Sequence, residues 1–162
     1  MAKSESPVEI SIADAATPDV VEAFARLLPQ LSSSAVPLTR ESLTEIIAAP
    51  HNTVLLARDP SAGGRIVGTL TLVIFRIPTA MRAWIEDVVV DDTVRGRGIG
   101  EALTLAAVSL AKARGAKTVD LTSRQSRKAA HRLPVRQRRS IGGVEAFQQA
   151  GLRNPLKSAG RV

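Results

Sequence analysis

The chain has 162 residues, with 22 Lys and Arg against 15 Asp and Glu and a formal net charge of +7. It has no Cys, no Tyr and two His. This composition excludes disulfides, thiolate metal sites and a Cys nucleophile, and no metal is expected, while the length predicts one domain with a real core.

The first elements predicted are a strand and two helices. Residues 8–15 alternate apolar and polar side chains, as an opening strand does. A helix follows, with Thr17 as its N-cap and Pro29 expected to end or bend it. Thr39 opens a shorter helix that Pro50 stops.

Three strands are predicted next, over residues 53–58, 65–77 and 81–90. The two connections between them are too short for a crossover helix. The three strands should therefore form an antiparallel meander.

A helical pattern then starts at Ile99 and ends with Gly115 as C-cap. Residues 117–123 read as a strand parallel to 81–90, because such crossovers are right-handed. Residues 126–133 start another helix.

After Leu133 these signals fail. Residues 144–152 could at most make a short helix, and no strand alternation is sustained. The chain therefore divides into a domain over residues 1–133 and a basic, atypical segment over 134–162, which we expect to be poorly ordered.

The charge is concentrated in the same region. Residues 124–162 contain ten Lys and Arg and one acid, Glu145, a net of +9, so residues 1–123 carry −2 of the total. A basic stretch can bind nucleic acid. Its only aromatic residue is Phe147, so it offers few stacking platforms, and nucleic acid is not the expected partner.

A turn between the strand at 81–90 and the following helix carries the strongest functional signal. Gly96, Gly98 and Gly100 stand on alternate positions, with Arg95 and Arg97 between them. Glycines permit positive φ and remove Cβ atoms from the approach path. Together with the free amides of a helix N-terminus and two positive charges, the turn suits a pyrophosphate.

Other interpretations of this turn can be compared by spacing. A dinucleotide-binding G-x-G-x-x-G motif starting at Gly96 would need Gly at position 101, which is Glu101, and the G-K-[ST] of a P-loop is absent. Both are disfavoured. The remaining alternative is a tight strand-to-helix turn with two solvated arginines.

The stretch WIEDVVVDDTVRGRGIGEALTLAAVSLAKARGAKTVDLTS, residues 84–123, resembles the central motif of the GCN5-related N-acetyltransferase (GNAT) superfamily. The family hallmark R/Q-x-x-G-x-G/A is met by Arg95, Gly98 and Gly100. A weaker resemblance covers residues 8–133. It implies an α/β fold with a mixed, mostly antiparallel sheet flanked by helices, whose final strands are missing or disordered here.

The resemblance also implies that the anion is the pyrophosphate of acetyl-CoA. The residues it assigns to the nucleotide end are Arg95, Gly96, Arg97, Gly98, Ile99 and Gly100. Main-chain groups of Val88 and Val90 would pair with the pantetheine arm, and the amide of Val88 or Val89 would polarise the thioester carbonyl. Arg127 lies where this family often places groups that touch CoA.

The same comparison offers a base. WIEDVVV is similar to the IED strand of small amine acetyltransferases, where the Glu lies near the reacting amine, so Glu86 is the candidate base. Asp87 is expected to be a structural partner. Strand alternation puts Glu86 on one side with Trp84, Val88 and Val90, and Trp84 is expected in the core or a pocket wall.

The expected general acid is absent. The family pattern A-x-x-x-Y-x-x-x-G-F, counted from Ala130, places Pro134 at the Tyr and Arg138-Arg139 at the Gly-Phe. A reading-frame slip near Leu133 is one hypothesis for this abrupt change. The resemblance therefore predicts an impaired acceptor half.

The expected function is transfer of an acetyl group from acetyl-CoA to a primary amine, in a small molecule. The alternatives are acetylation of a protein lysine or N-terminus, and a non-catalytic acyl-CoA-binding protein. Residues 1–11 lack the apolar segment of a secretory signal and no apolar run could span a bilayer, so a cytoplasmic protein without membrane contact is expected. The sequence leaves a homodimer open.

Overall fold

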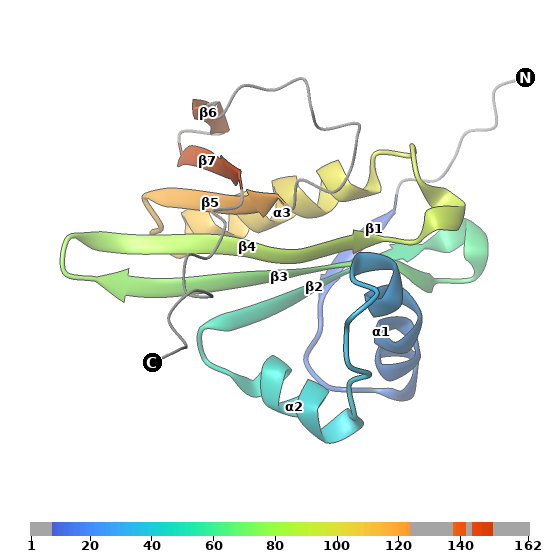
Figure 1. Ribbon diagram of the computed structural model, residues 1–162. Coiled ribbons are helices and arrows are strands. Elements are labelled where there is room, and N and C mark those ends of the chain that lie inside the picture. Colours follow the sequence, from blue (N-terminus) through green and yellow to red (C-terminus); the bar gives the residue numbers. More distant parts are fainter. Residues whose placement is uncertain (1–7, 124–137, 142–143, 151–162) are drawn as a thin grey trace, which may run out of the picture.

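The computed structural model describes residues 8–123, 138–141 and 144–150. Its helices and strands follow one another in the order β1 (Glu9–Ile12), α1 (Pro18–Leu31), α2 (Arg40–Ala48), β2 (Asn52–Asp59), β3 (Arg65–Ile77), β4 (Ala80–Val90), α3 (Ile99–Ala113), β5 (Thr118–Ser123), β6 (Arg138–Ile141) and β7 (Val144–Ala150). The strands form one sheet in the order β1-β2-β3-β4-β5-β7-β6, with α3 on one face and α1 and α2 on the other (Figure 1).

The two helices before the meander form where the sequence predicts them. Thr17 precedes α1 as N-cap, and Thr39 caps α2 by accepting the Ser42 amide at 3.1 Å. Pro29 lies inside α1, which continues to Leu31. Of the two expected effects, the end of the helix at Pro29 is therefore wrong. Two residues from the helix end, a proline removes only one hydrogen bond of the last turn.

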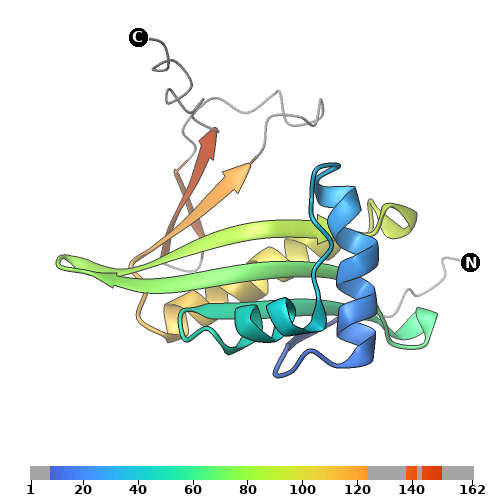
Figure 2. The same ribbon diagram turned by 60° about the horizontal axis from the view of Figure 1, so that its bottom comes forward.

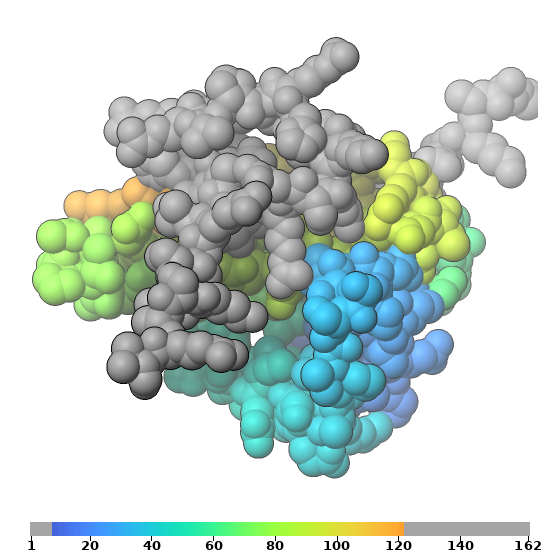
Figure 3. Space-filling model, in the orientation of Figure 1, coloured from blue at the N-terminus to red at the C-terminus, as the bar shows by residue number. Residues whose placement is uncertain are grey.

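The sheet separates two apolar clusters. The first packs α3 against β2 to β5, around Leu70, Leu72, Ile85 and Leu103. The second packs α1 and α2 against the opposite face and consists of Ala13, Ala16, Val20, Ala23, Phe24, Leu27, Leu43, Val54, Leu56, Ile66 and Val89. In the space-filling view α1 and α2 form a continuous blue-to-cyan surface over that face (Figure 3).

The predicted meander and crossover are confirmed. β2 pairs with β3 and β3 with β4, both antiparallel, and β5 pairs with β4 in parallel after the α3 crossover. The α/β fold with a mixed, mostly antiparallel sheet is therefore the observed one.

The described part of the C-terminal segment departs from expectation. Residues 138–141 and 144–150 form strands β6 and β7, so the short helix predicted over 144–152 is wrong for the residues described, and final strands are present. β7 pairs in parallel with β5 and antiparallel with β6. The open edge of β5 provides this pairing, because sheet context outweighs weak local preference. The helix predicted at 126–133 lies outside the described residues.

Candidate functional site

The glycine turn joins β4 to α3. After a short 3₁₀ turn at Asp92–Val94, Gly96 and Gly98 adopt φ of 83° and 73°. A Cβ at either position would meet no atom within 4 Å, so packing does not require glycine there. The left-handed backbone does, because a Cβ strains it.

The N-terminus of α3 opens onto this turn without a side-chain cap. Gly98 is the N-cap residue and offers no side chain, in contrast to Thr39 at the start of α2. The Ala102 amide donates to the Gly98 carbonyl at 2.9 Å, and the amides before it have no partner within the helix. Partial positive charge is therefore concentrated where an anion could bind.

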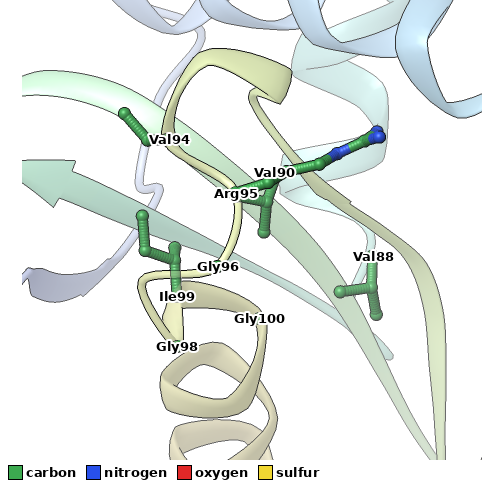
Figure 4. Close-up of a pocket in the computed structure, with 8 residues that line it drawn as sticks. All are labelled: Val88, Val90, Val94, Arg95, Gly96, Gly98, Ile99 and Gly100. Carbon is green, nitrogen blue, oxygen red and sulfur yellow. The ribbon is translucent and has the colours of Figure 1, made fainter.

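A cavity of about 360 Å³ lies beside this helix end. It is lined by Val88, Val90, Val94, Arg95, Gly96, Gly98, Ile99 and Gly100. Figure 4 shows the glycines on the turn that runs into α3, and Val88 and Val90 on the neighbouring strand. The structure thus brings together most of the residues predicted to bind the cofactor. Val94 is an addition that the sequence did not single out.

Two of the described residues predicted to bind the cofactor do not line this cavity. Val89 is buried on the opposite face of the sheet, in the cluster under α1 and α2. The guanidinium of Arg97 pairs with Asp59 instead. Arg127 lies outside the described residues.

The two arginines of the turn have different environments. Arg95 is 44% exposed, forms an ion pair with exposed Asp92, and extends past Val90 in Figure 4. Arg97 is only 20% exposed and its Nη1 donates to Oδ2 of buried Asp59 at 2.6 Å. Of these two arginines, Arg95 is the more exposed and is the one that lines the cavity.

A buried carboxylate fixes the start of the turn. Asp91 follows β4 directly, and its Oδ1 accepts the amide of Thr93 at 3.1 Å and the Thr93 hydroxyl at 2.8 Å. Arg26 of α1 pairs with its other oxygen and also donates to the Ile66 carbonyl at 2.7 Å. Burial raises the pKa of Asp91, but the Thr93 hydrogen bonds and the Arg26 and Arg65 charges outweigh it and lower the pKa below 3.8.

A β-bulge interrupts β4 just before the cavity. Thr71 pairs with Glu86, whereas Thr69 pairs with Val89, so β4 contains one extra residue here. Asp87 lies in the bulge with φ of 49° and is the non-glycine residue with positive φ in the part of the chain that the structure describes. Such a conformation tends to occur where function demands it.

The bulge overturns the predicted side of Glu86. Ile85 belongs to the cluster under α3, and Val88 and Val90 pack against that same cluster. Glu86, next to Ile85 in regular strand, therefore faces the α1 and α2 side together with Trp84. Strand alternation predicts Glu86 beside Val88 and Val90, because no local pattern signals the extra residue.

The bulge also coincides with a gap in the sheet. The β4–β5 ladder ends at the pair Ile85 and Leu121, although β4 runs to Val90 and β5 to Ser123. The two strands diverge beyond this point (Figure 2). From Glu86 onward, β4 has no β5 partner among the described residues, so this strand edge can pair with a bound extended ligand.

Trp84 does not lie in the core, which is one of the two places expected for it. It is 41% exposed on the Glu86 face and meets Phe75 edge-to-face, with ring centroids 5.9 Å apart at 82°. A core position is therefore wrong, and the indole forms part of the surface next to Glu86 on the strand.

Comparison with known proteins identifies the family. The Acetyltransferase (GNAT) family model matches residues 19–137, well over half of the chain. The chain therefore belongs to the GNAT acetyltransferase family.

Relatives with known structures or functions agree with this assignment. Glucosamine 6-phosphate N-acetyltransferase 1 of Oryza sativa subsp. japonica is 36% identical over 104 residues, which cover 60% of this chain and 62% of that enzyme. A putative acetyltransferase from Agrobacterium tumefaciens is 26% identical with a TM-score of 0.66, covering 76% of this chain and 86% of that one. A Trypanosoma brucei acetyltransferase is 27% identical with a TM-score of 0.63, covering 83% and 99%.

Neither a metal site nor a membrane-spanning helix is found among the described residues. The described residues contain no cluster of three or more His, Asp or Glu that could hold a metal ion. None of the described helices is long and apolar enough to cross a bilayer.

Proposed function

We propose that this chain is an acetyl-CoA-dependent N-acetyltransferase that acts on the primary amine of a small molecule. The supporting observation is the arrangement of three features: an uncapped α3 N-terminus at a glycine turn, an adjoining cavity, and a β4 edge that diverges from β5. Each feature suits a different part of acetyl-CoA.

The nucleotide end of the donor fits the turn. The amides at the start of α3 and the exposed guanidinium of Arg95 would hold the pyrophosphate. Main-chain groups of Val88 and Val90 would pair with the amides of the pantetheine arm, as an added strand does. When bound, acetyl-CoA supplies an activated acetyl group as a thioester.

The bulge allows donor and acceptor to approach from opposite faces of the sheet. Val88 and Val90 face the α3 side, whereas Glu86 faces the α1 and α2 side. Because the β4–β5 ladder ends at Ile85, donor and acceptor would meet beside β4 beyond that pair. The amine would then reach the thioester from the Glu86 side, while the amide of Val88 or Val89 polarises the carbonyl oxygen.

Glu86 is the proposed base. A primary amine is an ammonium ion at neutral pH and must lose a proton before it can attack. The Glu86 carboxylate would accept that proton, directly or through one water. The chain has no tyrosine to act as general acid, so water is the proposed proton source for the leaving thiolate.

A small amine is favoured over a protein amine by two observations. The rice relative is named for an amino sugar phosphate. The face next to Glu86 also carries the half-exposed Trp84–Phe75 pair, and an ammonium group is attracted to such rings. The class of acceptor is therefore a compact cationic amine.

A thiol-release assay tests this function. Purified protein is mixed with acetyl-CoA and a panel of small amines, amino sugars and a lysine peptide. The proposal predicts CoA release that depends on at least one small amine and exceeds release with the peptide. Peptide-dependent release alone would instead identify a protein acetyltransferase.

The absence of tyrosine favours one second candidate, a non-catalytic acyl-CoA-binding protein. Binding of CoA in calorimetry, with no thiol release from any amine of the panel, would identify this function.

A further inference from the structure

The ion pair between Arg97 and Asp59 gives the glycine turn an anchor on another part of the fold. Arg97 stands between the positive-φ residues Gly96 and Gly98. Its guanidinium donates to Asp59 at 2.6 Å, across 38 positions of sequence. Asp59 ends β2, so the contact ties the turn to the sheet.

Asp59 is itself held rigidly. Its side chain is 2% exposed, and Oδ1 accepts both the Ser61 amide at 2.9 Å and the Ser61 hydroxyl at 2.6 Å. Oδ2 is left for Arg97. The Ser61 hydrogen bonds and the Arg97 guanidinium lower the pKa of Asp59, so the carboxylate is ionised at neutral pH.

This arrangement is unexpected for an anion site. A buried carboxylate adds a negative charge one arginine side chain away from the turn, and it engages the guanidinium of Arg97. If charge were the only factor, a neutral residue in place of Asp59 would favour binding of an anion more than the aspartate does. The carboxylate must therefore contribute something other than favourable charge if the turn binds an anion.

We propose that Asp59 is a positioning residue, which holds Arg97 and thereby fixes the Gly96–Gly98 turn in the shape that receives the pyrophosphate. This inference rests on the proposed function, since it assumes that the turn binds CoA. A glycine-rich turn has many accessible conformations, and ordering it on binding would cost affinity. The ion pair fixes the turn before the ligand arrives.

Asp59→Asn separates this account from the electrostatic one, because the two predict opposite signs. If charge dominates, the substitution removes an anion, releases Arg97 and strengthens CoA binding. If positioning dominates, it loosens the turn and weakens CoA binding by about tenfold, equivalent to about 1.4 kcal/mol.

The experiment is isothermal calorimetry with CoA and with pantetheine, which has the same arm without the nucleotide. Weaker CoA binding with unchanged pantetheine binding supports the proposal. Equal loss for both probes, or tighter CoA binding, overturns it. Asp19→Asn is the matched control, because it breaks another Asp–Arg ion pair. Asp19 pairs with Arg58 at 2.8 Å, and Arg58 is the residue just before Asp59 in the sequence. It should change neither affinity.

A double-mutant cycle provides a second readout. If Asp59 acts through Arg97, Arg97→Gln alone and Asp59→Asn/Arg97→Gln should lose CoA affinity equally. Additive losses would mean that the residues act separately, which would contradict the proposal. Wild-type protein that binds no CoA would refute the proposed function itself, a result distinct from either outcome in the variants.

Discussion

At the scale of single residues, two adjacent carboxylates have different environments. Glu86 ends the regular part of β4, half-buried, on the face of Trp84, whereas Asp87 is exposed and occupies the bulge at positive φ. Aspartate tolerates this conformation better than most residues. Asp87 therefore shapes the strand, and Glu86 is the carboxylate that we propose as the base.

Glu86→Gln should lower amine-dependent thiol release by about 10²- to 10⁴-fold, the usual contribution of a positioned base. CoA affinity should not change, because Glu86 lies on the face opposite the cavity. Asp87→Asn is the control: it removes the same charge one residue away, and asparagine tolerates positive φ. Equal losses of activity in both variants would contradict the role given to Glu86.

At the scale of elements, one glycine sets how closely α3 approaches the sheet. A Cβ at Gly68 of β3 would lie 3.1 Å from Leu103 Cδ1, 3.2 Å from the Val89 carbonyl and 3.4 Å from Ile99 Cγ2. Leu103 and Ile99 belong to α3, so this contact determines where the helix N-terminus lies. The close approach therefore positions the proposed anion site.

Gly68→Ala should lower the free energy of unfolding by about 1–3 kcal/mol, as overpacking does. Gly100→Ala, whose Cβ would meet only Val90 Cγ2 at 3.7 Å, should leave stability unchanged or raise it, because alanine favours helix. Urea unfolding measures both. A destabilisation of the same size in the two variants would show that close packing at Gly68 is not the cause.

At the scale of the whole molecule, ion pairs with buried carboxylates connect distant segments around the turn. Asp91 joins the end of β4 to α1 through Arg26 and to β3 through Arg65. Asp59 joins the end of β2 to the glycine turn through Arg97. Each carboxylate must stay ionised for these contacts to persist, so stability should depend on pH.

Folding lowers the pKa values of Asp59 and Asp91, so as the pH falls the unfolded chain binds more protons than the folded chain. The stability from these two groups is complete above the unfolded carboxyl pKa, near 3.8, and is lost as the pH falls through the lowered values. Urea unfolding from pH 7 to 2.5 should show a decline beginning near pH 4. Asp91→Asn should be less stable at pH 7 and show a shallower decline; an unchanged slope would contradict this assignment.

The parts of the fold that the sequence predicts are those with local signals. The bounds of β3 and the start of α3 follow from apolar periodicity and from the glycine turn. The bulge at Asp87 has no such signal, since three consecutive valines fit either face, and the predicted side of Glu86 was therefore wrong. The Arg97–Asp59 pair depends on tertiary contact between distant positions, and β7 depends on pairing with β5. The assignment of cofactor and base to particular residues stays a prediction.

The most direct test of the central claim is calorimetric titration of CoA into the folded wild-type chain, Gly98→Ala and Gly115→Ala. Gly98 and Gly115 flank opposite ends of α3 with φ of 73° and 81°, and a Cβ at either meets nothing within 4 Å. Each alanine should therefore destabilise the fold to a similar extent, by about 1 kcal/mol. The account predicts CoA binding to the wild type and to Gly115→Ala, and weaker binding to Gly98→Ala. A folded wild-type chain without affinity for CoA, or equal affinities in the two variants, would contradict it.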